Sequence, residues 1–460
     1  MGNIQLLVDF GSTFTKVVAV DLIGEEIVSR VQVPSTVDED ITIGLKEALQ
    51  KIKADIKIGI LEEKEALACS SAAGGLRMVS IGFVPDLTCE AATRAALGAG
   101  AKMVGRYSYE LTRQEITEIE EISPDIILLA GGTDGGNKRV IIHNARMLAS
   151  SQSLRAYIVV AGNKAAQDEI KTILESSGKP NRLTKNVMPE IGTIDVDSCR
   201  EVIREVYIRN VTEAKGIAKA RQILKDIIMP TPVAVLTAAQ LLSEGYMGED
   251  GWGELVVVDI GGATSDVHSI AKGNSVKGDV ILTGLPEPYV KRTVEGDLGM
   301  RHNIHTLVEL GQMKGMLPVN GFERVVEMFS VVNRLPKSEE EFVYDSALAG
   351  VAVQIATDRH AGKTDVVYGP MGEMQVQKGK DLTDVGIVIG TGGPIVFSSD
   401  PKGILKHALF NSREARSLKP KKPKFYLDND YILYAMGLLS KVDPKKALDL
   451  MKKYIKRLET

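Results

Sequence analysis

The sequence predicts an α/β protein in which one domain is duplicated. Three observations support this class: two segments share the same order of apolar runs and tight turns, strand and helix patterns alternate between them, and 460 residues suffice for two or three domains. Asp9 and Asp259, which end the first apolar run of each segment, are 250 residues apart. A repeat this long indicates a duplicated domain rather than a solenoid of short units.

Each of the two segments reads as three strands joined by tight turns. In the first, apolar or alternating runs occupy residues 4–9, 16–22 and 27–33, with turns at 10–13 and 24–25. In the second, the runs occupy residues 255–259, 266–271 and 276–282, with turns at 260–263 and 273–274. Short apolar runs bounded by Gly, Ser and Asn are typical of β-strands and their turns.

The region between the two segments alternates between helix and strand patterns. We expect helices at 91–100, 114–122 and about 165–176, strands at 125–130 and 157–161, and a long helical stretch at 198–227. A helix at 234–244 ends at Gly245, and the glycine-rich connection at 248–253 is a candidate domain boundary. We therefore divide the chain into a first half at 1–247, with an inserted α/β subdomain at about 55–195, and a second half at 248–460.

The C-terminal part is expected to complete the second half. An apolar strand at 384–389 ends in a glycine-rich turn, and the basic, proline-containing stretch at 413–424 reads as a linker or exposed loop. Two helices follow, at 431–439 and 444–458, the second with Asp443 as its N-cap and Pro444 in its first turn.

Composition narrows the function classes. With 56 basic against 60 acidic residues, the net charge of −4 favours neither nucleic acid nor a membrane surface as a partner. No apolar run approaches the roughly 20 residues of a membrane-spanning helix, and the N-terminal residues lack the pattern of a signal peptide. The three cysteines, Cys69, Cys89 and Cys199, show no disulfide or metal-ligand spacing. We expect a cytoplasmic protein.

The turn after the first strand combines a carboxylate with a tight, polar loop. Asp9 ends the strand, Gly11 lets the backbone turn, and the hydroxyl and N–H groups that follow can face phosphate oxygens. A carboxylate at this place can organise Mg²⁺ through its bound waters. By itself the pattern also fits a β-hairpin with a polar turn.

The same device recurs in the second segment. Asp259 ends its strand, and Gly261 and Gly262 allow close backbone approach to a phosphate. Asp259 offers a second carboxylate for Mg²⁺ or for the attacking water; Asp266 is either a third or an exposed strand residue. Two agreeing copies make a nucleotide site a stronger prediction than one copy does.

These segments resemble the phosphate motifs of the actin/Hsp70/sugar-kinase superfamily. The run 230–245 resembles its first connecting helix, residues 390–393 stand where its adenosine motif is expected, and residues 431–439 resemble its second connecting helix. The resemblance implies duplicated ribonuclease H-like domains that bind ATP or ADP with Mg²⁺. The implied catalytic residues are Asp9, Asp259 and Asp266, with Asp9 and Asp259 also at the metal. The implied cofactor-binding residues are Gly11, Ser12, Thr13, Thr15, Lys16, Gly261, Gly262, Ala263, Thr264, Gly390, Thr391, Gly392 and Gly393.

A narrower resemblance covers nearly the full length. Residues 68–76, 84–88, 129–137 and 293–299 resemble the MutL family, also called glutamate mutase accessory proteins. The resemblance implies a slow, chaperone-like ATPase whose partner is an adenosylcobalamin-dependent mutase such as glutamate mutase. By analogy with diol dehydratase reactivases, its implied task is the release of damaged cobalamin. A homodimer is left open.

Several alternatives stay open at this point. Residues 131–136 also resemble an adenosine motif, although they come early in the chain, so either glycine-rich turn could contact adenosine. A small-molecule kinase, a nucleotide-dependent scaffold and an iron–sulfur activator of 2-hydroxyacyl-CoA dehydratases are rival functions. Residues 361–364 fail the P-loop pattern because Thr357 replaces its first glycine. Asp266 and His268 begin a cobalamin-binding pattern that Ala271 breaks, so we do not expect this chain to carry the cobalamin itself. Whether cobalamin contacts the chain directly is left open.

Overall fold

The structure, a computed structural model, describes residues 4–37, 39–56, 66–71, 76–213, 219–220, 223–224, 226–273, 280–332, 334–369 and 372–459. The chain divides into two compact units. The larger unit comprises Met1–Ala72, Glu213–Thr283 and Glu287–Thr460, and the smaller unit comprises Ala73–Thr212 and Gly284–Pro286. Among the described residues, no helix is both long enough and apolar enough to cross a bilayer.

The first sheet of the larger unit has five strands. In spatial order they are β10 (Asp226–Pro230), β4 (Leu67–Ser70), β1 (Ile4–Phe10), β2 (Phe14–Asp21) and β3 (Glu26–Pro34). The first three strands of the sequence form an antiparallel meander, and β4 and β10 run parallel to β1. Helix α1 (Ile41–Asp55) packs on β2 and β3 and begins at the N-cap Asp40, whose side chain accepts a hydrogen bond from the Thr42 N–H.

The second sheet repeats this order. Its strands are β16 (Val290–Glu295), β14 (Ser265–Ile270), β13 (Leu255–Ile260), β19 (Ile387–Thr391), β20 (Lys424–Leu427) and β21 (Lys456–Arg457). Again three strands form an antiparallel meander, and the next two run parallel to the first of them. The order third–second–first–fourth–fifth is therefore common to both sheets. This duplicated ribonuclease H-like arrangement, with an α/β insertion between β4 and β10, is the architecture of the actin/Hsp70 ATPase fold.

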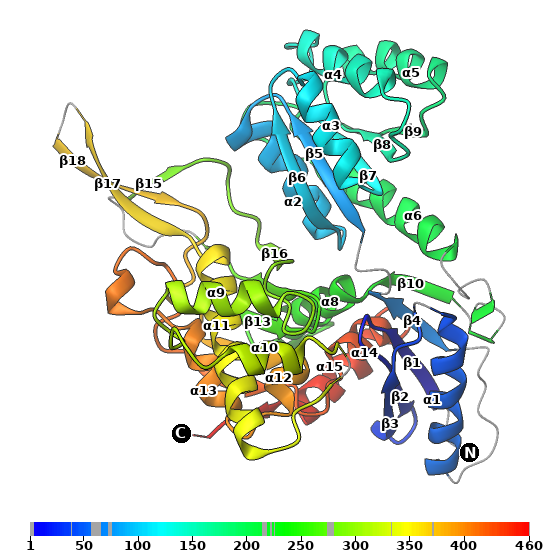
Figure 1. Cartoon of the computed structure of the whole chain (residues 1–460), viewed down its shortest axis with the longest axis vertical. Coiled ribbons are helices and arrows are strands. Elements are labelled where there is room, and N and C mark those ends of the chain that lie inside the picture. The colour runs from blue at the N-terminus through cyan, green and yellow to red at the C-terminus, as the bar shows by residue number, and fades with distance from the viewer. Residues whose placement is uncertain are drawn as a thin grey trace. The chain divides into compact units, whose positions relative to one another are not determined.

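Two helices pack together in the core that joins these sheets. Helix α8 (Thr231–Glu244) follows β10, and α14 (Leu433–Leu439) follows β20; Figure 1 shows them side by side. A Cβ added at Gly437 would lie 1.9 Å from the carbonyl oxygen of Ala234, so the two backbones nearly touch. Only glycine allows this approach, and the buried side chains of both helices belong to one core with those of β1 and β13.

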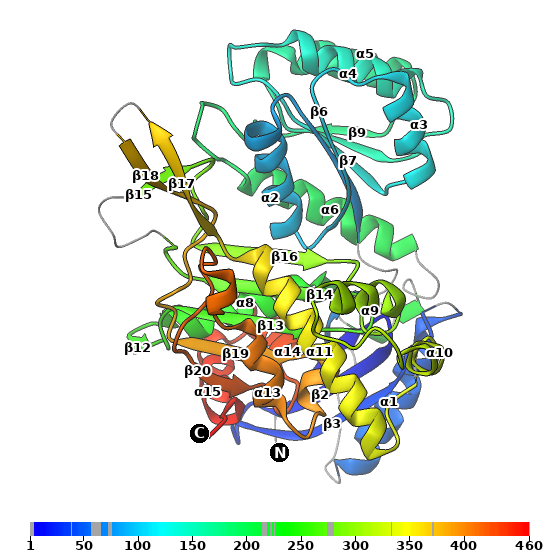
Figure 2. The same cartoon turned by 60° about the vertical axis from the view of Figure 1, so that its left-hand side comes forward.

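The larger unit has further helices and strands around its two main sheets. They are β11 (Gly245–Tyr246), β12 (Glu249–Asp250), β15 (Val280–Thr283), α9 (Ile304–Met313), α10 (Glu323–Phe329), α11 (Glu339–His360), β17 (Lys363–Gly369), β18 (Gly372–Lys378), α12 (Gly393–Val396), α13 (Pro401–Leu405) and α15 (Pro444–Tyr454). Figure 2 shows α11 lying across the second sheet, where it packs on β13, β14 and β16. Strands β15, β18 and β17 form a separate three-stranded sheet.

The smaller unit is a three-layer sandwich around a parallel sheet. Its strands, in spatial order, are β6 (Lys102–Ser108), β5 (Arg77–Gly82), β7 (Ile126–Leu129), β8 (Tyr157–Val160) and β9 (Asn181–Leu183). Helices α3 (Arg113–Ile122), α4 (Arg139–Ser150) and α5 (Gln167–Ser176) cover one face, and α2 (Glu90–Gly98) covers the other. Helix α6 (Asp197–Glu213) lies beside α2, where the Arg200 side chain contacts Gly98.

Most predicted strands and helices are confirmed, but two expectations are wrong and a third holds only in part. The third strand of the second meander is β16, because β15 pairs with β18 in another sheet; residues 276–279 lie outside the described part. The long helix predicted to reach residue 227 ends earlier, since 226–230 form β10. The stretch 413–424 is an exposed loop only in part: Arg413 and Lys421 are exposed, but residues 417–420 are buried, and Nζ of Lys419, which is 1% exposed, lies 2.5 Å from Oδ1 of Asp358.

Of the other expectations from the sequence, one is confirmed, one is not tested, and some fall on residues that the structure does not describe. Asp443 caps α15 as predicted, accepting a hydrogen bond from the Lys446 N–H at 3.0 Å, although the helix ends at Tyr454 rather than 458. The connection at 248–253 contains part of the β11–β12 hairpin. The boundary at residue 247 stays a prediction. Residues 72–75 of the segment that resembles the MutL family, and residue 274 of the second turn, lie outside the described residues.

Candidate functional site

The two predicted phosphate turns have the same local geometry. The N–H of Gly11 donates to the carbonyl of Phe14 at 3.0 Å, and the N–H of Gly261 donates to the carbonyl of Thr264 at 2.9 Å. A Cβ at Gly11 would lie only 2.6 Å from the Phe14 oxygen. Glycine is required there for steric reasons, and the repeat seen in the sequence is a repeat in three dimensions.

The turns of the two halves contact each other. A Cβ added at Gly262 would lie 2.7 Å from Oγ1 of Thr13. That Thr13 hydroxyl is buried and has no hydrogen-bond partner among the described residues. Buried hydroxyls are normally paired, so this one is available to a bound group. The second turn is held from behind by the N–H groups of Met300 and Arg301, which donate to the carbonyls of Gly261 and Gly262.

Asp9 is the penultimate residue of β1 and is almost fully buried. Its Oδ2 lies 2.9 Å from Nζ of Lys16, which stands directly opposite on β2. Its Oδ1 accepts a hydrogen bond of 2.5 Å from the Thr231 hydroxyl at the start of α8, and Sγ of Cys69 lies 3.6 Å from the same oxygen. Both carboxylate oxygens are therefore engaged by the chain itself.

Lys16 is held by aromatic rings as well as by Asp9. Its Nζ lies 4.1 Å from the ring centroid of Tyr431 and 5.5 Å from that of Tyr434. Burial acts to lower the pKa of Lys16, but the Asp9 carboxylate outweighs it, so the pKa is well above its usual range. Tyr431 adopts a left-handed backbone, with φ of 53°, where the chain turns into α14. Lys16 thus contacts the second connecting helix.

Asp259 has the register of Asp9 but different surroundings. The residue directly opposite it on β14 is Asp266 rather than a lysine. Burial, followed by the charge of Asp266, raises the pKa of Asp259 to about 7. Asp266 is itself buried and paired, with its Oδ1 2.6 Å from Nη2 of Arg292 and its Oδ2 accepting from the Thr264 hydroxyl. Asp266 is therefore no exposed strand residue, and its charge is already compensated.

The structure does not bring every predicted residue to this place. Thr15 is buried on the other face of the first sheet, where its Oγ1 faces Gly44 of α1. The hydroxyl of Thr391 donates a hydrogen bond of 2.9 Å to the carboxylate of Asp428. Gly392, with φ of 91°, packs against the Ile260 carbonyl, which brings the 390–393 turn against the end of β13. The adenosine role of that turn stays a prediction.

Several residues around this site were not predicted from the sequence. They are Thr231, Tyr431, Tyr434, Arg292 and Asp428. Thr231 and Tyr431 stand at the starts of the two expected connecting helices, which is a usable signal. Arg292 carries none, because its partner Asp266 is fixed by strand pairing that local patterns do not reveal.

The site fits a magnesium nucleotide. Two glycine turns leave room for backbone approach, the Thr13 hydroxyl has no partner in the described part of the chain, and burial, followed by the charge of Asp266, raises the pKa of Asp259, which a bound cation would counteract. Among the described residues, no three Asp, Glu, His or Cys side chains are grouped as a ready metal cage. Mg²⁺ beside phosphates commonly takes only one or two carboxylates and keeps several waters, so two aspartates suffice.

Comparison with known proteins agrees with this geometry. The family described as "MutL protein" matches residues 5–455. The chain belongs to the MutL family. A family relative, Protein MutL of Clostridium tetanomorphum, is 47% identical over 459 residues, which cover 98% of each chain.

Solved structures resemble this MutL-family chain only remotely. A nucleotide-free acetone carboxylase has a TM-score of 0.44 at 14% identity, covering 96% of this chain and 70% of the other. A gluconate kinase from Lactobacillus acidophilus has a TM-score of 0.35 at 11% identity, covering 99% and 93%. Likenesses this remote carry no argument about function, which rests instead on the family and the site.

Proposed function

We propose that this MutL-family protein is an ATP-dependent accessory protein that reactivates an adenosylcobalamin-dependent mutase, such as glutamate mutase, by releasing damaged cofactor. The observation that carries the ATP part is the contact between two equivalent Asp–Gly turns, one from each sheet, at Thr13 and Gly262. The mutase part is supported by family membership and by the sequence resemblance described above.

Different residues of the site would bind the phosphates and the magnesium ion. The N–H groups around Gly11 and Gly261 and the Thr13 hydroxyl would hold phosphate oxygens, and Asp9 and Asp259 would hold Mg²⁺ through its waters. Bound Mg²⁺-ATP would supply a phosphoanhydride bond to be hydrolysed. Asp259, with its pKa raised to about 7, is suited to accept a proton from the attacking water near neutral pH.

The same contacts offer a route from nucleotide state to partner binding. Thr13 belongs to the first sheet and Gly262 to the second, so groups bound at both turns would tie the two halves together. Lys16 extends this connection to α14 through Tyr431 and Tyr434. A mutase that prefers one closure of the halves would then be bound or released as the nucleotide changes. We place this activity in the cytoplasm, where the three free cysteines would stay reduced.

The proposal is tested by reactivation in a single tube. Glutamate mutase that has been inactivated by damage to its bound cobalamin is incubated with this protein and Mg²⁺-ATP. Mutase activity and ATP hydrolysis are followed in the same sample. We expect recovery with the wild type and none with Asp9→Asn. Hydrolysis without recovery would contradict the mutase as partner.

A small-molecule kinase is the second candidate, since the raised pKa of Asp259 also suits a base for a substrate hydroxyl. In the same tube, phosphorylation of an added sugar or polyol, in place of phosphate release, would favour it. Slow turnover that no mutase or substrate alters would instead favour a nucleotide-dependent scaffold.

A further inference from the structure

The sheet of the smaller unit has a topological switch point. The chain runs from β5 outward to β6 and then returns to β7 on the other side of β5, in the spatial order β6-β5-β7-β8-β9. All neighbouring strands are parallel. In doubly wound sheets of this order, ligands bind in the crevice beyond the carboxyl ends of the two strands where the order reverses. Here these ends lead into residues 83–88 and 130–138.

The loop after β7 presents backbone donors at this place. Gly131 and Gly132 are buried and adopt φ values of 140° and 71°, which glycine tolerates. Among the described residues, the N–H groups of Gly131, Gly132 and Thr133 find no hydrogen-bond acceptor, whereas the Ala130 N–H donates to Ile81 at 2.8 Å. Buried N–H groups are almost always paired, so the unpaired N–H groups of the buried Gly131 and Gly132, followed by that of the half-buried Thr133, indicate an external acceptor.

Side chains from neighbouring loops hold this loop in shape. Asn163, which is fully buried, donates through Nδ2 to the carbonyl of Gly136 at 3.0 Å and accepts from the Gly135 N–H at 3.3 Å. Asn186, 4% exposed, donates to the Gly132 carbonyl at 2.9 Å and to Oδ1 of Asp134 at 3.0 Å. The donors are thereby fixed in place before a ligand arrives, which lowers the entropic cost of binding.

An exposed aromatic ring lies at the same carboxyl end of this sheet. Tyr109 directly follows β6 and is 59% exposed. Its backbone is tied to the end of β5, because its N–H donates to the carbonyl of Gly82, the last residue of that strand, at 3.1 Å. The buried side chain of Asn144 holds the Tyr109 carbonyl at 2.9 Å. A ring anchored in this way offers a face on which a planar group can stack.

We propose that the carboxyl end of this sheet, at residues 83–88, Tyr109 and 130–138, binds a phosphate-bearing small molecule with a planar ring. The unpaired N–H groups of Gly131, Gly132 and Thr133 would donate hydrogen bonds to the phosphate oxygens. The Tyr109 ring would stack on the planar ring of the ligand. A free nucleotide and the nucleotide tail of a cobalamin both have this chemistry. The site lies wholly within the smaller unit and does not depend on the ATP site proposed above.

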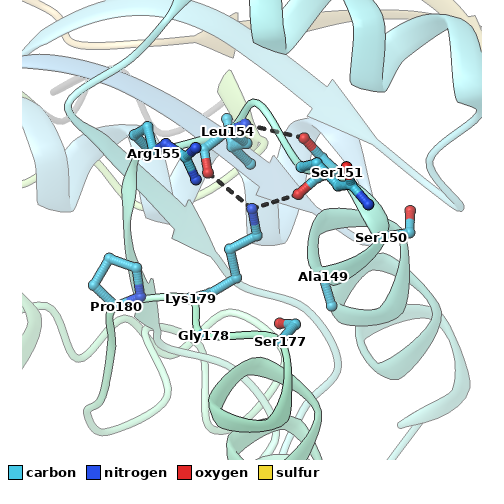
Figure 3. Close-up of a pocket in the computed structure, with 10 residues that line it drawn as sticks. Ala149, Ser150, Ser151, Leu154, Arg155, Ser177, Gly178, Lys179 and Pro180 are labelled. Atoms are coloured by element: carbon cyan, nitrogen blue, oxygen red, sulfur yellow. Dashed lines mark hydrogen bonds between the residues drawn. The ribbon is translucent and has the colours of Figure 1, made fainter.

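A hollow at the opposite edge of the same sheet serves as a reference. It has a volume of about 500 Å³ and lies where α4 leads to β8 and α5 leads to β9. Its one buried cation is already satisfied: Nζ of Lys179 donates to the carbonyls of Ser151 at 2.5 Å and Leu154 at 2.8 Å (Figure 3). Burial, then the charge of Arg155, lowers the pKa of Lys179. This lysine closes the end of α4 and needs no ligand.

The test measures binding of two probes, ADP and hydroxocobalamin, to the whole protein by equilibrium dialysis. Thr133→Glu places a negative charge beside the unpaired N–H groups, and Tyr109→Ala removes the ring. Gln152→Glu adds the same charge at the reference hollow, where the side chain is exposed. ATP hydrolysis is read in the same samples, and Asp9→Asn is included to identify any ADP bound at the other site.

We expect one probe to bind with an affinity that Thr133→Glu lowers at least about tenfold, while Gln152→Glu leaves it unchanged. For ADP, the comparison is made in the Asp9→Asn background, so that binding at the proposed ATP site does not contribute. Tyr109→Ala should weaken the same probe. The probe affected tells the nucleotide and cobalamin sources apart. The inference is overturned if Thr133→Glu and Tyr109→Ala alter the binding of neither probe, or if Gln152→Glu weakens binding equally. If the wild type does not hydrolyse ATP, the proposed ATPase activity is refuted, but the proposed binding site in the smaller unit is not.

Discussion

Lys16 and Asp266 occupy equivalent places in the two sheets, each directly opposite the aspartate that ends the first strand of its half. Lys16 gives Asp9 a cation at 2.9 Å, whereas Asp266 adds a second carboxylate beside Asp259. The duplicated strands are therefore electrostatically unequal. Asp9 is compensated within the chain, and Asp259 is the carboxylate that gains most from a bound cation.

The raised pKa of Asp259 predicts a pH dependence of stability without nucleotide or metal. The folded chain holds this proton up to about pH 7, whereas an unfolded aspartate loses it near pH 3.8, so the free energy of unfolding should fall as pH rises through this window. We expect the free energy of unfolding of Asp259→Asn to be about 2 kcal/mol higher than that of the wild type at pH 8 and equal to it near pH 4. Urea unfolding in EDTA measures this. Asp365→Asn, at an exposed site, should show no such pattern; equal pH profiles for Asp259→Asn and wild type would refute the assignment.

Removing the partner of Asp9 should cost stability. Lys16→Met leaves a carboxylate that is 1% exposed with only neutral donors, Thr231 and Cys69. We expect a loss of about 3 kcal/mol in the free energy of unfolding at pH 7. Lys51→Met removes an exposed ion pair on α1 and should cost less than about 1 kcal/mol. A loss no larger than that of Lys51→Met would show that the Lys16–Asp9 pair contributes little.

The contact between the two turns predicts a selective loss of nucleotide binding. Gly262→Ala would place a methyl group 2.7 Å from Oγ1 of Thr13, so that this hydroxyl must rotate out of its place or the two turns must separate. We expect calorimetry to show at least about tenfold weaker binding of Mg²⁺-ATP, since small displacements of binding groups are costly. Gly386→Ala is the matched control because its Cβ would meet nothing within 4 Å. Unchanged affinity in Gly262→Ala would place the nucleotide elsewhere.

The crossing of the connecting helices predicts a purely structural effect. In Gly437→Ala the new methyl group would lie 1.9 Å from the carbonyl oxygen of Ala234, so α8 and α14 must separate. We expect a loss of about 3 kcal/mol or more, seen as a lower Tm in calorimetry. A Tm equal to that of Gly386→Ala would mean that the helices can move apart freely.

The parts of the fold that follow from local pattern were predictable. Strand-ending aspartates followed by Gly turns, and the Asp443 cap, depend on neighbours a few residues away. The third strand of the second meander was not predictable in this way. Segment 280–283 has strand character but pairs with β18, about a hundred residues later, and β16 takes its expected place. Strand partners are chosen by tertiary packing, which local patterns do not contain.

The site shows the same division. Asp9, Gly11, Asp259 and Gly261 could be proposed as site residues from the sequence because each turn is a contiguous motif, and their roles stay predictions. Thr15 was misplaced because alternate residues of a strand face opposite sides, and the motif alone does not say which side holds the ligand. The aromatic contacts of Lys16 come from Tyr431 and Tyr434, more than 400 residues away, and no spacing rule links them to the first turn.

The central claim is that the paired turns form one ATP site that hydrolyses ATP. Its most direct test is the rate of phosphate release from Mg²⁺-ATP by the wild type, Asp9→Asn, Asp259→Asn and Gly386→Ala, each shown to be folded. The account predicts slow turnover in the wild type and Gly386→Ala, and a loss of at least about a hundredfold in both aspartate variants. Turnover that survives in both aspartate variants, or its absence from the folded wild type, would contradict it.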